Sequence, residues 1–128
     1  KAMAHGTASI GKDRYRTEIT VGGHALVADE PPALGGGAAG PAPYDLLLAS
    51  LGACTAITLR MYADRKGWPL ESIEVGLRLH GIEEKKIART LTITGLDDEQ
   101  RARMADIAER TPVTLTLKNG LPIDTRLA

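Results

Sequence analysis

Residues 44–66, YDLLLASLGACTAITLRMYADRK, predict one long helix, and this helix decides the fold. Pro43 has the fixed φ that suits a first helical turn, and Gly67 ends the pattern. Between Asp45 and Arg60 the helix carries no charge and has no polar face. A helix that is apolar all round must be covered all round, and a chain of 128 residues has little material for that. We therefore expect a second copy of the chain to supply part of the cover, in an obligate homodimer.

Extended segments precede this helix. Residues 15–21 alternate between apolar and polar side chains, a Gly-Gly pair follows, and residues 24–29 resume the extended pattern. This arrangement predicts a β-hairpin, and residues 7–10 predict a further short strand. Residues 31–43, PPALGGGAAGPAP, contain four prolines and four glycines, which predict a mobile loop without regular helix or strand.

Two strands and a second helix follow the long helix. Residues 73–80 and 87–94 alternate with the period of a strand and predict an antiparallel pair. Asp97 lies where an N-cap is expected, with Gln100 three residues later as in a capping box. The second helix is expected to end near Arg110.

The chain is expected to close with a short helical turn and a strand. Pro112 suits the start of the turn, and residues 123–127 alternate as a strand does. The order strands, helix, strands, helix, strand predicts an α+β class. The length predicts a single domain, residues 1–128.

The composition excludes several classes of partner. Sixteen basic and sixteen acidic residues cancel, so no overall charge favours nucleic acid or an anionic membrane. The uncharged run of residues 46–59 is shorter than the roughly 18 residues needed to span a bilayer, so no membrane span is expected. The single cysteine allows no intramolecular disulfide, which favours a reducing cytoplasm. The histidines show no metal-ligand spacing and GGGAAG lacks the pattern of a phosphate loop, so we expect no metal and no cofactor.

Cys54 is the sharpest candidate for chemistry. On spacing alone, a lone cysteine in an apolar helix is more often a small buried hydrophobe than a nucleophile. Nucleophilic chemistry needs the thiolate, and a cation from another element is then required to stabilise it. Arg14 and Arg16, at the start of the hairpin, are the candidates, although an arginine on an exposed strand is usually just a solvated charge.

Residues 40–71, GPAPYDLLLASLGACTAITLRMYADRKGWPLE, closely resemble the OsmC/Ohr family, in particular its OsmC-like small redox proteins. ADEPP at 28–32, IAERTPVTLTL at 107–117 and IDTRLA at 123–128 extend the resemblance over nearly the whole chain. The resemblance implies an OsmC-like fold, in which β-sheets pack against two long helices in an intertwined homodimer. It also implies a peroxide-reducing site at the dimer interface.

The resemblance assigns roles to several residues. Cys54 occupies the position of the family's peroxidatic cysteine, which attacks the peroxide O–O bond as a thiolate and becomes a sulfenic acid. The family arginine that assists the thiolate maps to Arg16, or to Arg14. Tyr44 replaces the carboxylate of hydroperoxide-resistance members, and Asp45 follows one position later, so either is expected to be a hydrogen-bonding group near the site.

The family's second, resolving cysteine is replaced by Thr111, which cannot form a disulfide. The expected function is therefore reduction of organic hydroperoxides through Cys54, in an oxidative stress response, with an external thiol or dithiol as the reductant. The leucine-rich surroundings favour organic or lipid hydroperoxides over hydrogen peroxide. The alternative is a non-catalytic protein that binds a small apolar ligand or senses oxidants, and a third reading is a remnant in which Cys54 merely packs.

Overall fold

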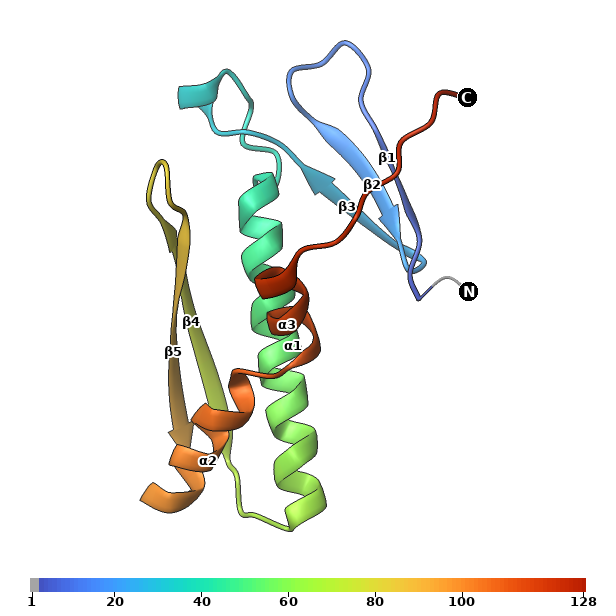
Figure 1. Cartoon of the computed structure of the whole chain (residues 1–128). Coiled ribbons are helices and arrows are strands. Elements are labelled where there is room, and N and C mark those ends of the chain that lie inside the picture. Colours follow the sequence, from blue (N-terminus) through green and yellow to red (C-terminus); the bar gives the residue numbers. More distant parts are fainter. Residues whose placement is uncertain (1–2) are drawn as a thin grey trace. The chain divides into compact units, whose positions relative to one another are not determined.

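The computed structural model describes residues 3–128 and has the predicted α+β class. The chain divides into two compact units, one ending at Leu47 and one spanning residues 48–128. The single domain expected from length stays a prediction. In chain order the elements are β1 (Gly6–Ser9), β2 (Thr17–Val21), β3 (His24–Ala28), the 3-10 turn η1 (Pro32–Leu34), α1 (Pro43–Lys66), β4 (Ser72–His80), β5 (Lys86–Thr94), α2 (Asp98–Ala108) and α3 (Pro112–Asn119) (Figure 1).

The first unit contains a three-stranded antiparallel sheet in the order β1-β2-β3. Gly22 and Gly23 join β2 to β3 with φ values of +57° and +80°. A two-residue hairpin turn of this kind needs positive φ at both positions, which glycine adopts without steric cost. The predicted hairpin and the predicted short strand before it are both confirmed.

A buried carboxylate organises the glycine- and proline-rich loop that follows the sheet. The side chain of Asp29 accepts backbone N–H groups from Tyr15 at 3.0 Å, Glu30 at 2.7 Å and Ala39 at 3.0 Å. These hydrogen bonds, the one from Ala39 first, hold the pKa of Asp29 below its ordinary value. The loop is irregular as predicted, apart from the turn η1, and Asp29 ties its two ends together.

Helix α1 has the predicted extent. It begins at Pro43 and ends where Gly67 takes a φ of +66°. The N–H of Gly67 bonds to the carbonyl of Asp64 at 3.1 Å, and the N–H of Trp68 bonds to that of Ala63 at 2.9 Å. This pair of hydrogen bonds is a Schellman ending, which satisfies carbonyls that the helix leaves free.

The core of the second unit lies between the C-terminal half of α1, helix α2 and the β4–β5 ribbon, which run side by side in Figure 1. Its buried members are Leu59, Ala63, Leu70, Met104 and Ala108. On α1, Gly52 permits close packing, because a Cβ there would lie 2.9 Å from the side chain of Leu77 on β4. The apolar phase of the strands, predicted from their alternation, therefore faces the helices.

Helix α2 starts as predicted. Asp97 is its N-cap, and its side chain accepts the N–H of Gln100 at 2.8 Å while the Gln100 side chain accepts the N–H of Asp97 at 3.1 Å. This reciprocal pair is a capping box. The helix ends at Ala108, two residues before the predicted end, and α3 extends the expected short turn to Asn119.

The predicted closing strand is wrong. Residues 121–128 form no strand, and no described strand pairs with them. An alternating sequence supplies the side-chain pattern of a strand, but a strand also needs a neighbour to accept and donate its backbone hydrogen bonds. Ile123 and Leu127 are 86% and 98% exposed, so the segment also lacks an apolar surface to pack on.

Only one stripe of α1 is covered. The buried positions recur every fourth residue, and they are Leu51, Thr55, Leu59 and Ala63. Ile57 and Met61 are 54% and 57% exposed, and a cavity of about 400 Å³ opens beside them. By length and composition alone α1 is also long and apolar enough to cross a membrane. Helix α1 therefore has an exposed apolar face, which a second copy of the chain is predicted to cover.

Candidate functional site

Cys54 lies near the middle of α1 and is half-buried. Its sulfur accepts a hydrogen bond from the backbone N–H of Val113, with a nitrogen–sulfur distance of 3.4 Å. The hydroxyl of Thr58, one turn along the helix, lies 3.9 Å from the same sulfur. The structure thus brings the backbone of Val113, two residues after Thr111, into direct contact with the only cysteine of the chain.

The Val113 N–H belongs to the N-terminus of α3. Thr111 is the N-cap residue of this helix, and its side chain makes no capping hydrogen bond. Pro112 has no N–H, so Val113 carries the first free donor of the helix, and the Cys54 sulfur is its acceptor. The sulfur therefore lies at the N-terminal end of α3, where the helix dipole has its positive end.

Thr111 is buried, and its hydroxyl is occupied by other hydrogen bonds. Its hydroxyl lies 2.6 Å from that of Thr114 and donates to the carbonyl of Ala108 at 3.4 Å. The threonine hydroxyl is thus part of the packing between α2 and α3. It offers no thiol with which Cys54 could pair.

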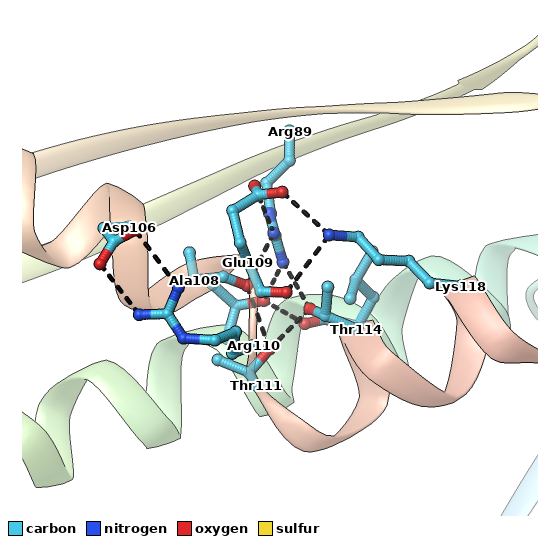
Figure 2. Close-up of polar contacts among 10 residues, drawn as sticks. Arg89, Asp106, Ala108, Glu109, Arg110, Thr111, Thr114 and Lys118 are labelled. Carbon is cyan, nitrogen blue, oxygen red and sulfur yellow. Dashed lines mark hydrogen bonds and ion pairs between the residues drawn. The ribbon is translucent and has the colours of Figure 1, made fainter.

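Arg89 joins these elements, and the sequence analysis missed it. It lies on β5 opposite Leu77 of β4, and its side chain is only 12% exposed. Its Nη1 donates to the hydroxyls of Thr55 at 3.0 Å and Thr114 at 2.9 Å, and its Nη2 donates to the carbonyl of Ala108 at 2.8 Å. Figure 2 shows the guanidinium pointing toward Thr114.

The sequence does contain a signal for Arg89. Within residues 87–94, it stands in the same phase as the apolar Ile87, Leu91 and Ile93, which face the helices. A charged residue in the apolar phase of a strand is unusual unless it is paired inside the protein. An arginine at such a position therefore indicates an internal polar partner even when no motif includes it.

A rim of ion pairs lies around this buried network (Figure 2). Glu109 accepts from Lys118 at 2.9 Å and from Arg89 at 3.5 Å, and Lys118 is the larger cause of the lowered pKa of Glu109. Asp106 pairs with Arg110 at 2.9 Å and with Arg103 at 3.0 Å, and Arg110 is the main cause of the lowered pKa of Asp106. The pairs of Glu109 with Lys118 and of Asp106 with the two arginines are exposed on both sides, so they contribute little to stability.

The other predicted site residues have local roles in the first unit. Arg16 is exposed and pairs with Glu18 at 3.2 Å, and Arg14 is exposed. Asp45 accepts the N–H of Ala42 at 3.0 Å and so caps the start of α1, whereas Tyr44 beside it is exposed. Their action on Cys54 stays a prediction.

The described residues also bear on metal binding. Within residues 3–128, no three histidine, cysteine or acidic side chains gather in a way that could hold a metal ion. The carboxylates around the site are paired with arginine and lysine instead.

Comparison with known proteins identifies a family. The family model for OsmC-like proteins matches residues 35–126. This range includes Cys54 and all of the buried network around Arg89. Among curated proteins, no relative matches the chain.

Solved structures with the same fold cover nearly the whole chain. The OsmC-like protein of Mycoplasma pneumoniae is 16% identical with a TM-score of 0.73, covering 92% of this chain and 89% of that one. The organic hydroperoxide resistance protein OsmC of Legionella pneumophila is 23% identical with a TM-score of 0.64, covering 92% of each chain. The organic hydroperoxide resistance protein OhrB of Bacillus subtilis is 26% identical with a TM-score of 0.62, covering 92% of this chain and 93% of that one.

Proposed function

Because the chain belongs to the OsmC-like protein family, we propose that it reduces organic hydroperoxides through Cys54, with an external thiol restoring the cysteine. The observation that supports this most directly is the hydrogen bond from the Val113 N–H to the Cys54 sulfur. Two proteins of similar structure are organic hydroperoxide resistance proteins. The site proposed here uses the one cysteine that the chain contains.

The first half of the reaction takes place at the sulfur of Cys54. The thiolate attacks the terminal, hydroxyl-bearing oxygen of the peroxide, and the O–O bond breaks. The alkoxide leaves and takes up the proton that the thiol gave up on ionisation, becoming the alcohol. The cysteine becomes a sulfenic acid, oxidised by the two electrons that reduce the peroxide. Before the attack, the N-terminus of α3 stabilises the negative charge on the sulfur through the Val113 N–H.

The second half of the reaction needs a reductant from outside the chain. Thr111 has no thiol, so an external thiolate attacks the sulfenic sulfur and releases water, forming a mixed disulfide. A second thiol of the same dithiol then displaces Cys54 and leaves as a cyclic disulfide. The cycle consumes one dithiol for each peroxide.

The remaining predicted residues complete the proposed site. Arg16, or Arg14, supplies a cation that further stabilises the thiolate, and Tyr44 or Asp45 provides a hydrogen-bonding group that orients it. A second copy of the chain covers the exposed face of α1 around Ile57 and Met61. Such an apolar environment favours the binding of a peroxide with an apolar tail, so organic hydroperoxides are the proposed substrates. The reducing cytoplasm is the compartment that supplies the external thiol.

The alternative is a protein that senses oxidants or binds a small apolar ligand without turnover. The specific observation in its favour is Thr111, whose hydroxyl is held by Thr114 and Ala108 and cannot resolve a sulfenic acid. A sensor of this kind forms one sulfenic acid per chain and stops. The two functions therefore differ in turnover in the presence of a dithiol.

A steady-state assay tests the proposal. We expect the protein with excess dihydrolipoamide to consume cumene hydroperoxide continuously, and to consume hydrogen peroxide more slowly. Cys54→Ser removes the nucleophile and is expected to abolish the activity. Equal rates for the two peroxides contradict the proposed substrate class, and no consumption beyond one peroxide per chain favours the sensor.

A further inference from the structure

The charge of Arg89 is nearly buried among neutral partners. Three of its hydrogen bonds go to the hydroxyls of Thr55 and Thr114 and to the carbonyl of Ala108. Its carboxylate contact, Glu109 at 3.5 Å, is exposed and also paired with Lys118. Withdrawing a guanidinium from water costs free energy that neutral acceptors offset only in part. The arrangement therefore calls for an explanation beyond a surface ion pair.

The three acceptors of Arg89 belong to three different helices. Thr55 is on α1, Ala108 is the last residue of α2, and Thr114 is in the first turn of α3. The Ala108 carbonyl lies at the negative end of the α2 dipole, which suits a cation. The planar fork of arginine can hold several acceptors in fixed directions, which a lysine cannot do. Arg89 is thus the group that fixes the three helices relative to one another at this point.

The two threonines that bind Arg89 are the chain neighbours of the two residues in the sulfur contact. Thr55 follows Cys54 directly on α1, and Thr114 follows Val113 directly on α3. The same Nη1 atom of Arg89 binds both threonines, at 3.0 Å and 2.9 Å. The contact between the Val113 N–H and the Cys54 sulfur therefore lies beside a clamp that joins the two helices.

We propose that Arg89 is a positioning residue for Cys54, which holds the N-terminus of α3 against α1 so that the Val113 N–H stays on the sulfur. The inference deepens the proposed function, because this contact is the one that favours the reactive thiolate. The hydrogen bonds of Arg89 go to Thr55, Thr114, Ala108 and Glu109, and none goes to the sulfur. Its effect on Cys54 passes through Thr55, Thr114 and the Val113 backbone.

A purely structural role for Arg89 makes a different prediction. If Arg89 only joined helices for stability, its loss would lower the free energy of unfolding and leave the reactivity of Cys54 in the folded protein unchanged. Arg60 provides a matched control for this reading. It also joins α1 to another segment through a backbone carbonyl, that of Leu70 at 2.9 Å, and its other hydrogen bonds go to Asp64 on α1 itself.

The experiment compares Arg89→Met, Arg89→Lys and Arg60→Met with the unaltered protein. The rate constant for alkylation of Cys54 by iodoacetamide is measured by intact mass, under conditions where denaturant unfolding shows each variant to be folded. We expect Arg89→Met to react about tenfold more slowly, the size of effect that a helix terminus exerts on a nearby charge. Arg89→Lys is expected to recover part of the rate, and Arg60→Met to stay within about twofold of the unaltered protein.

A spectroscopic signature accompanies the rates. In the unaltered protein, the backbone amide resonance of Val113 is expected to move when Cys54 is alkylated, because its acceptor changes. In Arg89→Met this response is expected to be lost. If Arg89→Met does not fold, Thr114→Val removes one acceptor of the same clamp and is expected to slow alkylation in the same direction.

Equal alkylation rates in the folded Arg89 variants and an unchanged Val113 response would overturn the inference. The outcome is separable from that of the proposed function, because alkylation and the amide signal need no peroxide turnover. If the protein fails to reduce peroxides but Arg89→Met is still alkylated more slowly, the proposed function is contradicted and the positioning role is supported.

Discussion

At the scale of single residues, the sulfur of Cys54 accepts its hydrogen bond from a backbone group, the N–H of Val113. The sequence places Cys54 in an apolar helix and suggests arginines as its partners. It does not reveal a backbone donor, because every residue except proline has a backbone N–H. The Val113 N–H is available because Pro112 before it has none and Thr111 leaves the helix uncapped. The family motif predicts Cys54 as the site cysteine, whereas the N–H that contacts its sulfur is found only from the packing of α3 on α1.

The substituted resolving position gives a direct test at this scale. The N–H of Val113 lies 3.4 Å from the Cys54 sulfur, and residue 111 is two positions before Val113 in the chain. We therefore expect Thr111→Cys to form an intrachain disulfide with Cys54 after peroxide treatment. Intact mass should show the loss of two hydrogens, and peptide mapping should join residues 54 and 111. Thr111→Cys combined with Cys54→Ser is the control, which should form none. Persistent free thiols after treatment contradict the predicted geometry.

Asp29 gives a pH-dependent prediction. Its pKa is lowered in the folded protein from the ordinary 3.8, so the stability it contributes is present above pH 3.8 and is lost as the pH falls through the lower folded value. Asp29→Asn replaces one acceptor oxygen by an N–H₂ group facing backbone donors. We expect this variant to unfold at lower denaturant concentration at pH 7. The difference from the unaltered protein should shrink below pH 3.8, and a difference that is constant with pH contradicts this account.

At the scale of elements, the local signals in the sequence predict the helices well. Pro43 and Gly67 mark the two ends of α1, and Asp97 with Gln100 marks the start of α2, because each acts on backbone groups within one turn. The strand predicted at 123–127 fails for the opposite reason. Its formation depends on a neighbour elsewhere, which its own alternation does not specify.

The stripe of α1 that packs in the core gives a stability prediction. Leu59 is fully buried with Met104 and Ala108, so Leu59→Ala should lower the free energy of unfolding by about 2–5 kcal/mol. Ile82, in the turn between β4 and β5, is 91% exposed, and Ile82→Ala should change it by no more than about 0.5 kcal/mol. Urea denaturation measures both. Losses of similar size would mean that the core lies elsewhere.

At the scale of the whole molecule, the open question is what covers the outer face of α1. We expect a second copy of the chain, so sedimentation equilibrium without detergent should give the mass of a dimer. Replacing Ile57 and Met61 together by glutamate should give monomers, because charges on a face buried between copies remain unpaired. A monomer at all concentrations contradicts the dimer. Recovery only in detergent would favour insertion of α1 into a membrane.

We propose that Cys54 is a peroxidatic cysteine that turns over with an external thiol. The most direct measurement is intact mass after brief exposure to cumene hydroperoxide with a sulfenic-acid trap, repeated with excess dithiol to count peroxides reduced per chain. We predict rapid trapping at Cys54 and many turnovers. An unmodified Cys54 would contradict the claim, and so would a single oxidation without turnover.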